Sequence, residues 1–386
     1  SVAYFIISTL LLPLMVQAFS CLVAWVISLI SSKMRNKNII TMVVSLLFLA
    51  AYFYLYSKMG DIISGLIANG TAIAVAFKKY AFPAYYFGVG IAEHNLTYLL
   101  LYTVCTLAVF ELVYAILSRS FRQITTAKKG TARIKYKERS MHVSSPAAAL
   151  LRKDFQHFIG NPMYVLNAWM GEILLVVACV AMLIKKDILT EFLPILNGEG
   201  EIMGLILCVI LCGLSCTNLI TAPSISLEGK NLWIAQSIPV PAGVVLRAKV
   251  KLQMLLCIPI TALSALLMGI VLKLELLTLV LAVLVPAAFN LFTALLGVVV
   301  NLHFPKFDYI NETVVIKQSM STMICMFGSM AVVLVLALLY ALLLSASVAP
   351  TLFLAVCLVL LVIVCVLMWR YLGHGGSARF AALQAD

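Results

Sequence analysis

The sequence predicts an all-α protein, a polytopic transmembrane helical bundle with about nine spans. Of the 386 residues, 63% are apolar and only 11% are charged, whereas a soluble domain carries roughly 25% charged residues. Apolar runs of about 20 residues recur, long enough to cross roughly 30 Å of hydrocarbon as helix, and the alternating strands of a membrane barrel are not seen. These observations exclude a soluble enzyme, a nucleic-acid binder and a disordered chain as descriptions of the whole sequence.

Nine apolar runs have the length of a span. They are 3–30, 39–57, 97–118, 163–184, 202–222, 248–272, 277–302, 319–345 and 350–372. Most of the 27 Lys and Arg residues lie in alternate connections, in and around 31–38, 119–153, 223–251, 303–318 and the C-terminal segment. The positive-inside rule places these connections and the C-terminus in the cytoplasm of a multi-pass plasma membrane protein. The net charge of +12 therefore reports orientation in the membrane, and no nucleic-acid partner is expected.

The first part, residues 1–118, has three predicted spans. The stretch 61–92 is interrupted by Gly, Asn, Lys and Pro and is rich in aromatic residues, so we expect one or two interfacial helices on the outer face. Residue 1 is not Met, and 1–30 lacks the basic start and the cleavage site of a signal peptide. We therefore expect further spans upstream of this sequence.

A basic linker, 119–146, precedes a six-span unit, 147–386. The segment 147–160 has apolar residues at helical spacing and charges on its other side, which predicts an amphipathic helix along the inner surface. Pro162 then fits the first turn of the next span. Two cytoplasmic segments, 223–247 and 303–318, are too polar to be simple turns. The first part resembles the last three spans of such a unit, an arrangement typical of duplicated transporters.

Motifs for catalysis or metal binding are not found. The nearest approach to a nucleotide-binding loop, Ser224 to Asn231 (SISLEGKN), lacks the first Gly and the final Ser or Thr, and it lies between membrane helices instead of after a strand. No catalytic residues and no metal ligands are assigned. Cys208, Cys212 and Cys216 share a helix face, and packing is favoured there over a soft-metal path.

Ionisable groups inside spans are costly and indicate functional sites. Glu172 lies near mid-membrane, where it either contacts substrate or is a buried structural partner. Glu111 lies near the cytoplasmic end of its span and can reach water, Arg119 or Arg122. The candidate translocation path consists of Glu172, Asn167, Asn218, Asn290 and Glu111, with structural roles as the alternative for each.

The two cytoplasmic segments carry a resemblance to a known family. The run Ser226–Trp233 (SLEGKNLW) resembles the S-x-E-G-K-N-x-W segment of a bacterial family of exporter permeases among the type-2 ATP-binding-cassette (ABC) transporters. Its second inner loop is similar to Phe304, Pro305, Lys306, Asp308, Asn311, Glu312 and Lys317 here. Its helix leading into the second unit is similar to Arg152, Lys153, Asp154 and Phe155. The resemblance has specific motifs over roughly 145–372 and is only architectural before that, and family members carry a longer N-terminal half with three further leading spans.

The resemblance implies a permease, not an enzyme, that partners a separate cytoplasmic ABC ATPase dimer. ATP and Mg²⁺ would bind that partner, with no cofactor in this chain, and two transmembrane halves would pair or the chain would form a homodimer in lipid. The residues implied to couple to the ATPase are Leu227, Glu228, Gly229, Lys230, Asn231 and Trp233. We expect Ile225, Leu227, Trp233 and Ile234 to supply apolar anchors and Glu228 and Lys230 to supply polar partners at the rim. The alternative is that Trp233 lies in the lipid interface.

Two further classes of function are considered. An ion-coupled secondary transporter would use Glu172 as its carrier. A membrane-embedded enzyme or scaffold would need a clustered polar site at one membrane face, and the sequence does not indicate one.

Overall fold

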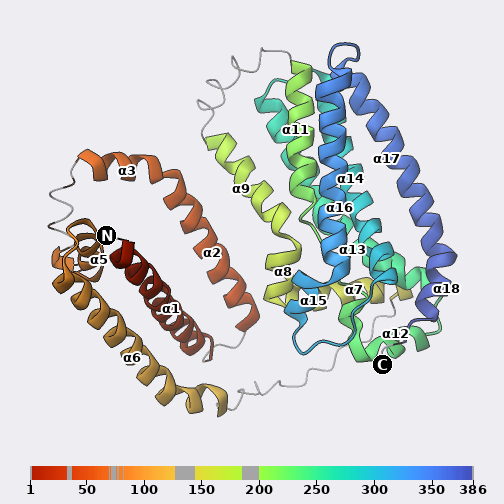
Figure 1. Cartoon of the computed structure of the whole chain (residues 1–386). Coiled ribbons are helices and arrows are strands. Elements are labelled where there is room, and N and C mark those ends of the chain that lie inside the picture. The colour runs from red at the N-terminus through yellow and green to blue at the C-terminus, as the bar shows by residue number, and fades with distance from the viewer. Residues whose placement is uncertain are drawn as a thin grey trace. The chain divides into compact units, whose positions relative to one another are not determined.

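A computed structural model describes residues 2–32, 37–68, 70, 75, 78–80, 82–126, 144–184 and 200–384. The chain divides into two compact units, Ser1–Arg139 and Ser140–Asp386, and the division falls within the predicted linker 119–146 (Figure 1). The described residues are helical and contain no strand, which confirms the all-α class. The basic residues predicted at 33–36 and 128–139, and the outer connection 185–199, lie outside the described residues.

The first unit contains five described helices. They are α1 (Val2–Ser32), α2 (Lys37–Ser57), α3 (Met59–Ala68), α5 (Phe82–Ala92) and α6 (Leu96–Thr126). Helix α6 packs against both α1 and α5, and α5 approaches it closely because Gly90 has no side chain to hold the backbone of Leu99 away. Helices α2 and α3 meet at a 50° bend. Helices α3 and α5 fall largely within the stretch predicted to hold interfacial helices.

The second unit is a larger bundle. Its helices are α7 (Pro146–Gly160), α8 (Pro162–Ala168), α9 (Met170–Ile184), α11 (Gly200–Ser215), α12 (Leu232–Ser237), α13 (Ala242–Val271), α14 (Leu276–His303), α15 (Glu312–Gln318), α16 (Met320–Leu339), α17 (Pro350–Gly373) and α18 (Gly375–Ala381). A 3₁₀ helix, Ser226–Asn231, precedes α12, and a π-turn, Tyr340–Leu344, follows α16. Helix α14 is central, because α11, α13, α16 and α17 all pack against it.

Helix α7 occupies the range predicted for the amphipathic helix. Ser145 caps its start by accepting the Ala148 N–H, while Leu150 and Phe158 are buried. Asn161 then caps α8 with its side chain, and Pro162 takes the first position of that helix, where its missing N–H costs nothing. Helix α7 packs against α13, which covers Leu150 and Phe158, whereas Phe155 and Ile159 remain exposed.

The nine-span count is not confirmed. Six helices in the described part of the chain are long and apolar enough to cross a membrane, or seven if the bent α2–α3 pair forms one span. The run 163–184 is broken at Trp169 and leaves α9 with 15 residues. The run 202–222 gives only the 16 residues of α11, which ends at Ser215. Apolar composition does not reveal these breaks, because buried side chains take over the backbone hydrogen bonds there.

Candidate functional site

The two helix breaks of the second unit lie side by side. The Leu219 N–H donates to the Ala168 carbonyl over 2.8 Å, which bridges the end of α8 to the segment that follows α11. Gly171 faces the Leu214 carbonyl so closely that an added Cβ would collide with it. The contact between α9 and α11 at this level therefore requires glycine.

A buried polar cluster surrounds these breaks. The Oε1 atom of Glu172, a residue only 1% exposed, accepts hydrogen bonds from Asn218 Nδ2 (2.9 Å) and from the Thr261 hydroxyl (2.7 Å). The Glu172 N–H donates to Asn218 Oδ1 over 3.1 Å. Asn290 Nδ2 donates to Ser215 Oγ (2.9 Å) and to Thr261 Oγ1 (3.0 Å). The cluster joins α9, α11, α13 and α14 through side chains that hydrocarbon could not satisfy.

The structure brings together three of the five residues of the predicted path. Glu172, Asn218 and Asn290 belong to the cluster, whereas Asn167 donates to the Met163 carbonyl of its own helix over 2.6 Å. Glu111 is exposed on α6 in the first unit. Asn167 is thus hydrogen-bonded within its own helix, and Glu111 belongs to the other unit.

Sequence reasoning missed the residues that complete this cluster. Besides Thr261 and Ser215, Gln253 of α13 accepts the Thr221 N–H over 3.0 Å and donates to the Asn218 carbonyl over 3.0 Å. Gln253 is fully buried and holds the non-helical segment after α11. The sequence feature that indicates Gln253 is its polar side chain inside the apolar run 248–272.

The segment between α11 and α13, residues 223–241, is called loop 1 here. Asn301, near the end of α14, accepts the N–H groups of Ile225 (2.8 Å) and Ser226 (3.1 Å) with its Oδ1. Its Nδ2 donates to Ser226 Oγ (2.7 Å) and to Ser321 Oγ (3.0 Å). A single amide thus attaches the start of loop 1 to α14 and α16.

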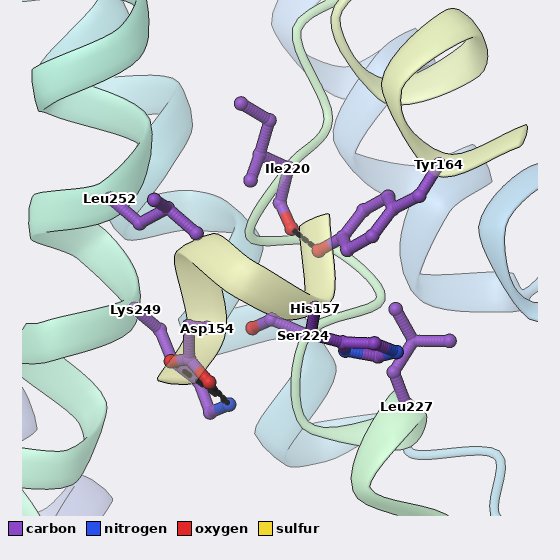
Figure 2. A pocket seen from close by; sticks show the side chains of 8 residues that line it. All are labelled: Asp154, His157, Tyr164, Ile220, Ser224, Leu227, Lys249 and Leu252. Atoms are coloured by element: carbon purple, nitrogen blue, oxygen red, sulfur yellow. Dashed lines mark hydrogen bonds and ion pairs between the residues drawn. The ribbon is translucent and has the colours of Figure 1, made fainter. Parts of the chain in front are cut away.

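A buried ion-pair network attaches loop 1 to α7 and α13. Glu228 lies 2.7 Å from the Nζ atoms of both Lys153 and Lys249, and Lys249 also lies 3.5 Å from Asp154. Figure 2 shows Asp154 of α7 facing Lys249 of α13. Burial alone would raise the pKa of the Glu228 carboxyl, but Lys249 and Lys153 outweigh it and lower that pKa to about 2. The Glu228 carboxyl is therefore ionised and paired with the two lysines.

The segment between α14 and α16, residues 304–319, is called loop 2 here. Hydrogen bonds join it to loop 1. The Tyr309 hydroxyl donates to the Leu227 carbonyl over 3.2 Å, and the Lys306 N–H donates to Ser226 Oγ over 2.9 Å. Gly229 has a φ of +53°, and an added Cβ there would lie 2.9 Å from the Tyr309 hydroxyl oxygen. Position 229 thus needs glycine for its backbone conformation and for the space around it.

Loop 2 also contacts the start of the second unit. Glu312 accepts a hydrogen bond from Asn161 and lies 3.6 Å from His157. The other predicted residues of this loop are Phe304, Lys306, Asp308, Asn311 and Lys317, which are exposed, and Pro305, which is half-buried. Arg152 and Phe155 of α7 are exposed as well.

Only part of the predicted apolar anchor set faces outward. Trp233 is 64% exposed and Ile234 is 46% exposed on α12. Ile225 and Leu227, predicted as anchors, are instead buried, because the turn held by Asn301 directs them into the bundle. Glu228, predicted at the rim, is engaged by the two lysines. Lys230 and Asn231 remain exposed beside Trp233.

Metal binding has no geometric support in the described part of the chain. No group of three His, Cys, Asp or Glu side chains there is placed to hold an ion. Cys208, Cys212 and Cys216 are buried within an apolar cluster, together with Leu211 and Phe289.

The described residues contain six long apolar helices, four of them in the second unit together with loops 1 and 2, which indicates a helical membrane protein. Residues 3–369 match the family described as "Putative ATP-binding cassette". The match covers nearly the whole chain, and the protein belongs to this family of the ABC transporters. Comparisons with curated proteins and with solved structures found no match.

Proposed function

We propose that this chain is the permease subunit of an ABC exporter, driven by a separate ATPase subunit. Membership of the family supports an ABC system. The stretch of sequence nearest to a phosphate-binding loop, 224–231, folds as a turn and a 3₁₀ helix, with the Tyr309 hydroxyl close to Gly229. A phosphate cradle needs free backbone N–H groups at a helix N-terminus, so nucleotide binding is assigned to the partner.

The proposal rests on two exposed apolar side chains of α12, a helix whose preceding turn is held by ion pairs. Trp233 and Ile234 project from α12, and a Trp that enters a groove on a partner is a typical interface hot spot. Glu228, five residues before Trp233, is tied to Lys153 of α7 and Lys249 of α13. Displacement of α12 by an ATPase would therefore move α7 and α13 with it.

The mechanism follows from this connection. ATP binding and hydrolysis on the partner would favour in turn the inward-facing and outward-facing packings of the permease, because the two ATPase states bind the loops differently. The chain itself breaks no bond. Substrate would pass along the interface between two transmembrane halves in the plasma membrane, with loops 1 and 2 and the C-terminus on the cytoplasmic side.

The test is co-elution of the full chain with candidate ATPases, together with measurement of ATP hydrolysis. Trp233→Ala should weaken assembly by at least about 30-fold, since hot-spot truncations cost 2 kcal/mol or more. The matched control is Leu276→Ala, which removes an apolar side chain that is 78% exposed at the first residue of α14, the end opposite loop 2. Assembly that is equally strong in both variants would contradict the coupling role of α12.

A second candidate function is an ion-coupled secondary transporter with Glu172 as the carrier. It is favoured by the position of this carboxyl at two adjoining helix breaks, an arrangement that secondary transporters use for ion binding. Glu172 Oε2 is buried and has no hydrogen-bond partner in the described residues. This candidate predicts transport that survives ATP depletion, collapses with an uncoupler and fails in Glu172→Gln.

A further inference from the structure

Helices α13, α14 and α17 line an apolar groove in the second unit. The groove has a volume of about 390 Å³. Met254 of α13, Leu291 and Leu295 of α14, and Val362 and Val366 of α17 line it. Its walls contain almost no polar atoms except at one end, where Arg370 belongs to the lining.

Three cationic side chains gather toward that end. The Arg247 guanidinium stacks on the Trp369 ring, 5.1 Å from its centroid. Arg247, Lys251 and Met254 share one face of α13, because four-residue and three-residue steps return to the same side of a helix. Lys251 and Arg370 are both exposed. The cations at 247, 251 and 370 therefore border the groove that Met254 lines.

These cations have no acidic partner among the residues that the structure describes. The six ion pairs found there involve other lysines and His157. Arg247 donates weakly to the Trp369 carbonyl over 3.5 Å, and its Nε atom is buried without an acceptor. Three positive charges are thus left to pair with a negative group from outside the described chain.

We propose that this groove binds an anionic phospholipid of the inner leaflet. One acyl chain lies along α14 between α13 and α17, and the phosphate lies among Arg247, Lys251 and Arg370. Basic pockets between transmembrane helices on the cytoplasmic side bind anionic headgroups in this way. Trp369 stands where tryptophans mark the membrane–water interface.

The length of the groove suits an acyl chain. The lining residues of α17 run from Val362 to Arg370, and eight residues of helix span about 12 Å. A single hydrocarbon chain of that length can lie along α14, and its phosphate is then placed at the cationic end.

The headgroup half of the proposal is tested with the purified full chain in detergent. Native mass spectrometry measures retention of added phosphatidylglycerol, which is anionic, and of phosphatidylcholine, which has no net charge. The wild type should retain phosphatidylglycerol at least tenfold better. The double variant Lys251→Gln/Arg370→Gln should lose this preference, and Lys273→Gln, an exposed cation at the other end of α13, should keep it.

The acyl-chain half is tested by filling the groove. Val366→Trp places a large side chain in the groove, whereas Leu367→Trp, the matched control, adds the same bulk at an exposed position that does not line it. Val366→Trp should reduce retention of both lipids at least tenfold relative to Leu367→Trp. All substituted positions are exposed, and melting temperatures equal to those of the controls show that each variant is folded.

Three results would overturn the proposal. The first is an unchanged preference for phosphatidylglycerol in the double variant, and Arg370→Gln alone serves in its place should that variant melt early. The second is equal lipid retention by Val366→Trp and Leu367→Trp. Equal retention of the two lipids by the wild type would equally contradict an anionic-lipid site.

Discussion

Neutralising Glu228 gives the sharpest test of how loop 1 is held. In Glu228→Gln the two short ion pairs to Lys153 and Lys249 are lost, and Lys249, which is only 3% exposed, keeps only Asp154 at 3.5 Å. The carboxyl pKa of about 2, compared with a usual 4.5, corresponds to about 3 kcal/mol of stability. Breaking a buried pair from one side costs a similar 3–5 kcal/mol.

The assay is thermal unfolding of the purified full chain in detergent. For a unit of this size each kcal/mol shifts the melting temperature by roughly 2–4 °C, so Glu228→Gln should melt roughly 6–12 °C lower. Asp308→Asn, an exposed loop 2 residue, is the control and should change stability by less than about 0.5 kcal/mol. Equal melting temperatures for Glu228→Gln and wild type would refute the assignment of a stabilising buried pair.

The same pair predicts a pH dependence with a definite sign. Because the folded-state pKa of Glu228 is lowered, its contribution is complete above pH 4.5 and is lost as the pH falls toward 2. The difference in melting temperature between wild type and Glu228→Gln should therefore shrink through this window. A difference that stays constant from pH 7 to pH 2 would contradict the electrostatic origin of the effect.

Three further substitutions, with one control, test the close contacts. Gly171→Ala should lower stability by more than about 2 kcal/mol or prevent folding, because its methyl group meets the Leu214 carbonyl. Gly213→Ala is the control, because its added methyl group lies in open space on α11; it should be neutral or stabilising by up to about 1 kcal/mol. A higher melting temperature for Gly171→Ala than for Gly213→Ala would contradict the close α9–α11 contact. Gly229→Ala should lower the free energy of unfolding by about 1–3 kcal/mol through its positive φ. Tyr309→Phe should lower it by about 1 kcal/mol through the lost hydrogen bond to loop 1. A wild-type melting temperature for either variant would contradict the contact between loops 1 and 2.

The long helices were predictable because their apolar runs are uninterrupted. The predicted spans 277–302 and 350–372 differ by one residue at each end from α14, and by at most one from α17. Helix α13 begins six residues before the predicted 248, since Arg247 and its neighbours continue the helix beyond the apolar run. Apolar composition indicates which segments can form a membrane-spanning helix, and the bounds of α14 and α17 follow mainly from it.

The helix breaks and the inward side of loop 1 were not predictable by the same reasoning. Asn218 is held by Glu172, which lies 46 residues earlier in the chain, and Ile225 is held by Asn301, 76 residues later. Glu228 finds Lys153 at a separation of 75 residues. Such pairings depend on the packing of distant helices, and a single sequence does not contain that information in its local pattern.

The measurement that tests the central claim most directly is site-specific photocrosslinking from α12. A photoreactive amino acid at position 233 of the full chain, expressed with a candidate ATPase, should produce a covalent product with the ATPase, and the same group at position 276 should produce none. Crosslinking at 233 to lipid alone, or labelling of this chain itself by a photoreactive ATP analogue, would contradict a permease driven through loop 1 by a separate ATPase.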